Sequence, residues 1–247
     1  MRRRFFAPPE DFRKQTITLT GDEARHLREV LRLKVGDEVF VFDGTGKEFR
    51  CTIEHARRDE ALLSGCEEVA AKCPESPLKL WLAVALLKGE KFDLVVQKAT
   101  ELGVTGIVPV MTRHADIHLH DASDAEKRVS RWRRIGIEAA KQCGRAFVPS
   151  IVLPVAFETV IEDSAHSARL IFSERNGVHI VEALKSLPQP ASVIAMVGSE
   201  GGWADEEISA ASRAGWRILT LGGRILRAET AAITATVLLQ NKWGDLG

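Results

Sequence analysis

Two apolar runs in the last third of the chain end in glycines, and they constrain the fold more than any other stretch. Val193 to Val197 leads into Gly198-Ser199-Glu200-Gly201-Gly202, and Trp216 to Leu221 leads into Gly222-Gly223. Short apolar runs of this kind are typical of buried strands. Each loop is followed by a helical pattern, acidic at its start after the first loop and rich in alanine and leucine after the second. Because glycine has no Cβ, such loops let the backbone approach a ligand closely.

The chain from Leu78 onward alternates between strand-like and helix-like patterns. Leu78 to Leu86 is apolar and strand-like, Phe92 to Leu102 has apolar residues at helical spacing, and Gly106 to Met111 is a second apolar run. A strand, a helix and a strand in this order predict a βαβ unit, with parallel strands and helices on both faces of the sheet. A further strand is expected at Ala168 to Phe172, where Ser173-Glu174 would form a third side of the pocket.

The first part of the chain has a different pattern, with short alternating runs. Thr16 to Leu19, Glu38 to Phe42 and Glu48 to Ile53 alternate as half-buried strands do, and Asp43-Gly44-Thr45-Gly46 is a strong hairpin turn. One helix interrupts them, capped by Thr20 or Asp22. Several short strands joined by glycine turns predict a small β-barrel.

A short polar segment separates the two patterns. Cys73-Pro74-Glu75-Ser76-Pro77 contains two prolines and no periodicity, as linkers do. We therefore expect two domains, at residues 1–73 and 78–247.

Composition restricts the class of protein. Lysines plus arginines equal aspartates plus glutamates, at 34 each, so overall charge gives no indication of a nucleic-acid partner. The basic start lacks the apolar segment of a signal peptide, and no stretch is long and apolar enough to span a bilayer. The four cysteines, Cys51, Cys66, Cys73 and Cys143, include no C-x-x-C pair. They favour reduced thiols over a zinc site or a disulfide framework, and the whole pattern predicts a cytoplasmic protein.

A group of histidines and aspartates raises the question of a metal site. His114, His118 and His120 lie close to Asp116 and Asp121, and imidazoles and carboxylates are ligands of zinc. The segment reads as an exposed loop, without a helix or strand to preorganise the ligands. We therefore predict no metal site.

The usual nucleotide-binding and hydrolase motifs are missing. Gly44-Thr45-Gly46-Lys47 is followed by Glu48, so it is neither a Walker A loop nor a G-x-G-x-x-G fingerprint, and neither H-E-x-x-H nor G-x-S-x-G occurs. A dinucleotide enzyme or a nucleoside triphosphatase is disfavoured. A small-molecule α/β enzyme remains an alternative, and it would show no RNA affinity that falls with salt.

The second glycine loop carries a resemblance to a known family. Residues Leu221 to Ala231 read L-G-G-R-I-L-R-A-E-T-A, which matches throughout the L-G-x-R-I-L-R-x-E-T-A segment of the 16S ribosomal RNA uracil-N3 methyltransferases, RsmE, of the SPOUT superfamily. Gly198 to Gly202 is similar to the G-P-E-G-G loop of that family, with Ser199 in place of proline. Gln97 to Gly103 resembles a further segment, whereas Thr112 to Ala115 departs from the family's T-E-R-S.

The resemblance implies a fold and an assembly. It implies an α/β fold in which a SPOUT-type parallel sheet, flanked by helices and ending in a C-terminal trefoil knot, follows an N-terminal PUA-like β-barrel that binds RNA. It also implies a homodimer. General rules of topology disfavour knots, so this expectation comes from the family alone.

The resemblance also implies a cofactor and a catalytic residue. The methyl donor would be S-adenosylmethionine, whose transfer requires alignment and exclusion of water rather than a metal. Arg227 would stabilise the anion formed when uracil N3 loses its proton. Glu200 or Glu229 could accept that proton or merely cap a helix, and this alternative stays open. The cofactor would be bound by glycine-loop backbone, by apolar walls and by N–H groups at a helix start, the residues being Gly198, Glu200, Gly201, Leu221, Gly222, Ile225, Leu226, Thr230 and Ala231.

The expected substrate is a uridine of 16S ribosomal RNA in the small ribosomal subunit. Arginines suit phosphates, and an exposed phenylalanine ring suits an unpaired base. On this basis and by resemblance, the predicted RNA-binding residues are Arg4, Phe5, His26, Arg32 and Arg145. At least one of Phe5 and Phe6 is expected to be a core residue instead. The alternatives are a SPOUT enzyme acting on another RNA, or an inactive RNA-binding relative.

Overall fold

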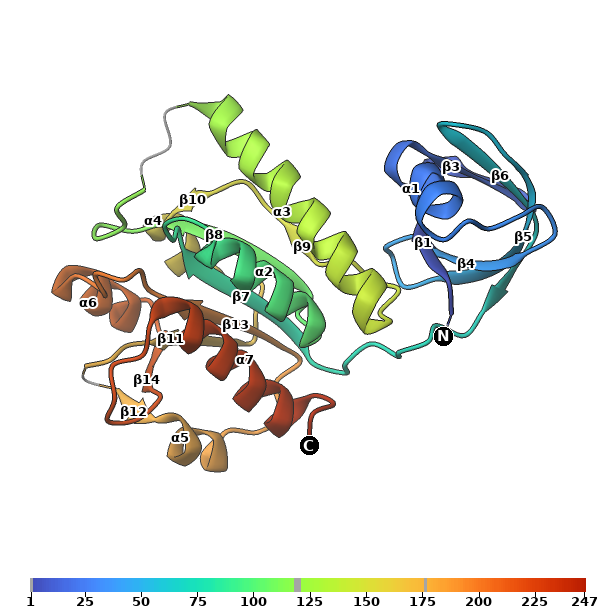
Figure 1. Cartoon of the computed structure of the whole chain (residues 1–247). Coiled ribbons are helices and arrows are strands. Elements are labelled where there is room, and N and C mark those ends of the chain that lie inside the picture. The colour runs from blue at the N-terminus through green and yellow to red at the C-terminus, as the bar shows by residue number, and fades with distance from the viewer. Residues whose placement is uncertain (1, 118–120, 176) are drawn as a thin grey trace. The chain divides into compact units, whose positions relative to one another are not determined.

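The computed structural model describes residues 2–117, 121–175 and 177–247, and it divides into two compact units (Figure 1). The first unit comprises Met1–Glu75 and Ile137–Val148, and the second comprises Ser76–Gly136 and Pro149–Gly247. The predicted ranges, 1–73 and 78–247, placed residues 137–148 in the second domain. The structure instead groups this segment with the first unit.

The first unit is built on a six-stranded sheet in the order β1-β4-β5-β6-β3-β2. Strand β1 pairs parallel with β4, and the other neighbours pair antiparallel. The sheet curls around a core that includes Phe5, Leu19, Leu27 and Val41. Its elements are β1 (Arg4–Phe6), a 3-10 turn (Pro9–Asp11), β2 (Phe12–Arg13), β3 (Thr16–Thr20), α1 (Gly21–Arg25), a π-helical turn η2 (His26–Val30), β4 (Glu38–Phe42), β5 (Glu48–Ala56) and β6 (Glu60–Val69). The predicted PUA-like β-rich fold is confirmed, as a curled sheet with β1 and β2 at its edges.

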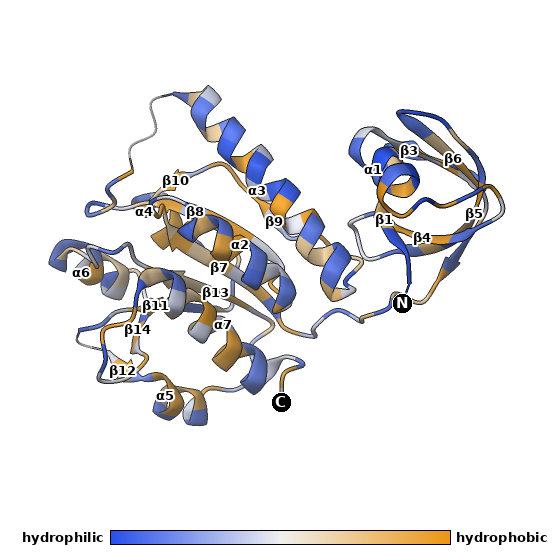
Figure 2. Ribbon diagram, in the orientation of Figure 1, coloured by the Kyte–Doolittle hydropathy of each residue, from blue (hydrophilic) through white to orange (hydrophobic). Residues whose placement is uncertain are grey.

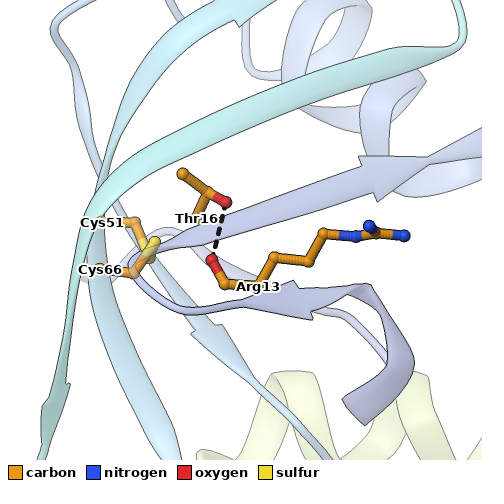
Figure 3. Close-up of a disulfide and its surroundings, with 4 residues drawn as sticks. All are labelled: Arg13, Thr16, Cys51 and Cys66. Carbon is orange, nitrogen blue, oxygen red and sulfur yellow. Dashed lines mark hydrogen bonds between the residues drawn. A yellow bond between two sulfur atoms is a disulfide. The ribbon is translucent and has the colours of Figure 1, made fainter.

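Two cysteines of the first unit are joined, contrary to the expectation of free thiols. A disulfide links Cys51 of β5 to Cys66 of β6, with a Cα–Cα distance of 4.2 Å (Figure 3). In the ladder between these strands Arg50 pairs with Glu67, and the same register places Cys51 opposite Cys66, next to the register shift before Thr52. The two cysteines are 15 residues apart in the sequence and belong to no C-x-x-C motif, so the sequence did not predict that they pair. Cys73 and Cys143 are free.

The second unit contains a parallel sheet with the order β10-β8-β7-β13-β11-β14-β12, and β9 also pairs with β8. All its pairings are parallel, as the βαβ pattern predicts. Its elements are β7 (Lys79–Ala85), α2 (Lys91–Glu101), β8 (Gly106–Met111), the first part of α3 (Ala122–Cys143), β9 (Ser150–Ile151), β10 (Val155–Ala156), α4 (Phe157–Ile161), β11 (Ala168–Phe172), β12 (Val178–His179), α5 (Ile180–Ser186), β13 (Ser192–Val197), α6 (Asp205–Arg213), β14 (Arg217–Thr220) and α7 (Ala228–Trp243).

Helices cover both faces of this sheet. One face carries Leu80, Leu82 and Val84 of β7, which pack with residues of α2, α3, α5 and α7. The alternate residue Ala83 belongs to the other face, under α4 and α6. Figure 1 shows α2 beside α7, and Figure 2 shows the apolar strands between the helices. Apolar residues on both faces explain why these strands read as continuous apolar runs.

Within residues 2–117, 121–175 and 177–247, none of the helices combines the length and apolar character needed to traverse a bilayer.

Candidate functional site

A cavity of about 400 Å³ lies where β11, β13 and β14 of the second unit end. Ligands of parallel sheets bind at the carboxyl ends of strands, where successive loops converge. Both glycine loops and the end of β11 contribute to its walls, with apolar and polar groups together. The lining residues are Phe172, Ser173, Glu174, Val197, Gly198, Ser199, Glu200, Gly201, Gly202, Trp203, Thr220, Leu221, Gly222, Arg224, Ile225, Leu226, Arg227, Ala228 and Ala231. Ser173 and Glu174 thus form the predicted third side.

The first glycine loop makes a tight turn after β13. The N–H of Gly202 donates to the carbonyl of Ser199 at 3.0 Å, and Gly202 has a φ of +69°, which glycine adopts without strain. A Cβ at Gly202 would lie 2.8 Å from Oε1 of Glu174. Trp203 follows the turn, and its Nε1 donates to the carbonyl of Phe172 at 2.8 Å. The Glu174 carboxylate could move away from such a Cβ, so it is mainly the positive φ that favours glycine at this turn.

The second glycine loop runs from β14 to the start of α7. Its last residue, Arg227, is exposed and occupies the position immediately before the helix. Ile225 lines the cavity with 86% of its surface exposed, so it is a rim residue rather than a buried wall. The N–H of Ala231 donates to the carbonyl of Arg227 at 2.8 Å. The prediction that Ala231 offers a free N–H is therefore wrong, because that group makes the first bond of the helix.

The carboxylate of Glu200 is paired with Lys91, the first residue of α2. Lys91 Nζ donates to Glu200 Oε1 at 2.8 Å. Partial burial works to raise the pKa of Glu200, but the Lys91 ammonium and backbone N–H groups outweigh it and lower that pKa below its ordinary value. A carboxylate with a lowered pKa is a weak proton acceptor. Glu200 therefore fits a role in holding the loop better than the role of base.

The cavity gathers most of the residues predicted to bind a cofactor. Arg227 and every predicted cofactor residue except Thr230 line it, and Thr230 is exposed on α7. The predicted cofactor residues do not include Trp203 or Arg224, although Trp203 directly follows the first glycine loop and Arg224 adjoins the selected Ile225. The cofactor-binding roles themselves stay predictions.

Three of the predicted RNA-binding residues are buried in the first unit. Arg4, Phe5 and Arg145 are 6%, 0% and 4% exposed. Arg4 Nε donates to Glu48 Oε1 at 3.0 Å, and Arg145 Nε donates to Glu75 Oε2 at 3.0 Å. Phe5 packs in the core. The prediction of RNA contacts is wrong for these three side chains in this structure, because their surfaces are already occupied by protein.

The two other predicted RNA-binding residues are accessible. His26 is partly exposed at the start of η2, with the Phe5 ring 6.0 Å away. Arg32 is exposed and has a φ of +52°, which is uncommon for a residue with a side chain. Both remain available to a ligand.

The metal hypothesis falls partly outside the described residues, which do not include His118 and His120. Across the part of the chain that the structure describes, no group of three or more His, Cys, Asp or Glu residues is arranged to hold a metal ion.

Two family models match the chain. An RNA methyltransferase domain matches residues 74–240, and an RNA methyltransferase PUA domain matches residues 19–64. Among curated proteins, ribosomal RNA small subunit methyltransferase E of Synechocystis is 34% identical over 94% of this chain and 75% of its own length. The Bacillus subtilis protein of the same name is 30% identical over 89% of this chain and 88% of its own length.

Solved structures agree over the whole chain. A methyltransferase from Legionella pneumophila in complex with the bound cofactor S-adenosylmethionine (SAM) has a TM-score of 0.90 and 34% identity, and covers 100% of both chains. Ribosomal RNA small subunit methyltransferase E from Neisseria gonorrhoeae, bound to S-adenosylmethionine, has a TM-score of 0.89 and 32% identity with the same coverage.

Proposed function

Because the chain belongs to the ribosomal RNA small subunit methyltransferase E family, we propose that it methylates N3 of a uridine in 16S ribosomal RNA. The methyl donor is S-adenosylmethionine, and the product is 3-methyluridine. The observation that carries the proposal is the convergence of both glycine loops on one cavity. The motif with Arg227 and the loop with Glu200 are thereby brought to a single site.

The residues around the cavity suit this cofactor. A volume of about 400 Å³ lies within the range of small-molecule sites. Leu221 and Leu226 offer apolar surface for a heterocycle, and backbone at Gly198, Gly201 and Gly222 offers donors and acceptors without side chains in the way. When bound, S-adenosylmethionine supplies an electrophilic methyl group on a sulfonium. The protein has to orient the uracil and exclude water.

In this proposal, Arg227 acts on the uracil. Uracil N3 is protonated near neutral pH and has to lose its proton, which leaves negative charge on the ring. The Arg227 guanidinium is always charged and lies at the cavity wall, so it can stabilise that anion. Glu200 is already paired with Lys91 and does not take the role of base in this proposal.

The proposal extends to RNA recognition and to assembly of the protein. The substrate is the small ribosomal subunit, and within the first unit we expect RNA contacts at the accessible residues His26 and Arg32. The PUA-like and methyltransferase ranges, 1–73 and 78–247, the trefoil knot, the homodimer and the cytoplasmic location stay predictions. Light scattering coupled to gel filtration tests the homodimer.

Methyl transfer tests the function directly. Purified protein is incubated with labelled S-adenosylmethionine and unmodified small subunits, and in parallel with naked 16S RNA. The RNA is then digested to nucleosides for mass spectrometry. Appearance of 3-methyluridine, and its loss in Arg227→Ala, is the expected result. Donor binding without transfer would indicate another RNA substrate, and RNA binding without donor binding would indicate an inactive relative.

A further inference from the structure

The loop after β8 contacts the first glycine loop through two hydrogen bonds. The Ser199 hydroxyl donates to the carbonyl of His114 at 3.0 Å. In the other direction, Nδ1 of His114 lies 3.2 Å from the carbonyl of Gly201. A carbonyl oxygen only accepts, so this contact requires the proton on Nδ1. Residues 199 and 201, which flank Glu200, are thus bonded to the same histidine.

The two loops also pack without space between them. A Cβ at Gly201 would lie 2.8 Å from Cβ of His114 and 3.0 Å from its carbonyl oxygen. Cβ atoms do not approach other atoms to 2.8 Å, so only glycine fits at position 201 while His114 stays in place. The contact therefore involves backbone on both sides, and a shift of one loop has to displace the other.

The loop that carries His114 is itself anchored. The N–H of Arg113 donates to Glu207 Oε1 at 3.0 Å, and Glu207 Oε2 accepts from the N–H of Ala204 at 2.8 Å. Glu207 is 7% exposed and lies in the first turn of α6. The neighbouring Ala115 is 6% exposed. His114 is therefore presented to the glycine loop from a fixed segment rather than from a freely moving one.

We propose that His114 and Ser199 are positioning residues for the methyl donor. Together they hold the backbone of Ser199 to Gly201, which lines the cavity, in the conformation that binds S-adenosylmethionine. The inference rests on the proposed function, since it concerns the same cavity. Both residues lie where the chain departs from the RsmE pattern, so the serine and the histidine form a contact that the pattern does not predict.

The test is the dissociation constant of S-adenosylmethionine, measured by calorimetry on full-length protein. Loss of one neutral hydrogen bond that stabilises the binding conformation should weaken donor binding about three- to tenfold. We expect this for Ser199→Ala and for His114→Ala. In the double variant, donor binding should be weakened by a smaller factor than the product of the two single factors, because both hydrogen bonds hold the same loop. Ser209→Ala, an exposed serine on α6 away from the cavity, is the matched control and should bind as the unmodified protein does.

His114→Asn separates positioning from proton transfer. The Asn side-chain amide can place a donor where Nδ1 of histidine lies, so it should restore donor affinity to within about twofold of the unmodified protein, a small part of one hydrogen bond. Its kcat should equal that of the unmodified protein, since the imidazole moves no proton in this proposal. In His114→Ala the loss should fall on the KM for the donor, with kcat largely kept.

Two results overturn the inference in distinguishable ways. If the unmodified protein binds the donor and both alanine variants bind it equally well, only the positioning role is wrong. If the unmodified protein binds no donor, the proposed function is wrong and the inference falls with it. Restored donor binding with a lowered kcat in His114→Asn would also contradict the proposal, because the imidazole would then act in the chemistry.

Discussion

Replacing Arg4 by methionine should destabilise the first unit by about 3–5 kcal/mol, the typical cost of removing one partner of a buried ion pair. The Arg4 guanidinium donates to Glu48 at 3.0 Å and to the carbonyls of Ala140 and Arg145 at 2.9 and 2.8 Å. Glu48 is fully buried. Its carboxylate would keep the N–H of Lys72 at 2.9 Å and a longer contact with Arg2 at 3.4 Å. These contacts compensate only part of the lost charge.

A second variant isolates the ionic contribution. Arg4→Met with Glu48→Leu removes both charges. It leaves the carbonyls near the end of α3 without their donor and the N–H of Lys72 without its acceptor. These neutral losses should cost less than Arg4→Met alone, because no charge stays buried without its partner. The second substitution, Glu48→Leu, thus removes the buried carboxylate that Arg4→Met leaves without its main partner.

Urea unfolding measures both effects. Far-UV circular dichroism follows the whole chain, whereas all five tryptophans lie in the second unit and report it separately. A cost below about 1 kcal/mol for Arg4→Met, a typical value for a surface ion pair, would refute the structural role. The folded double variant should bind 16S RNA with the affinity and salt dependence of the unmodified protein. A shallower salt dependence by about one phosphate contact would restore the RNA-binding prediction for Arg4.

Three further predictions concern the site and the thiols. Arg227→Ala should lower single-turnover methyl transfer about 10²- to 10³-fold, as loss of one oxyanion donor does, with donor affinity unchanged by calorimetry; an unchanged rate would exclude Arg227 from the chemistry. Because the pKa of Glu200 is lowered, its contact with Lys91 stabilises the loop above the unfolded-state pKa and is lost as pH falls through the folded pKa. Donor affinity should therefore be constant near neutrality and fall in acid, and Glu200→Gln should abolish that fall. Protein denatured without reductant should show two reactive thiols, since Cys51 and Cys66 are joined; four would contradict the disulfide.

The sequence predicted the elements of the second unit well, because local patterns specify them. The strands at Gly106–Met111 and Ala168–Phe172 have the predicted bounds. The glycines around Gly201 marked the site, since close backbone approach requires that residue type wherever it occurs. Signals of this kind lie within a few consecutive residues and need no knowledge of distant contacts.

Other features depend on contacts between distant residues and could not be predicted. Arg4 and Arg145 looked available to RNA because an arginine in a sequence carries no sign of its burial. Only the fold places the Arg145 carbonyl, 141 residues away, beside the Arg4 guanidinium. The contact between His114 and Ser199 spans 85 residues, and no local pattern connects them. The disulfide likewise required the register of β5 and β6.

Residues 137–148 belong to the first unit although they follow it by more than sixty positions in the sequence, and this has a consequence during protein synthesis. When Glu75 leaves the ribosome, the strands of the first unit are complete, but the carbonyls of Ala140 and Arg145 that Arg4 binds have not been made. At about 5–20 residues per second, Arg145 follows roughly 4–14 s later. During that interval the Arg4 guanidinium lacks the carbonyl acceptors of Ala140 and Arg145, while much of the intervening chain emerges. A gene truncated after the linker would therefore encode all six strands without the segment whose carbonyls bind the buried Arg4 side chain.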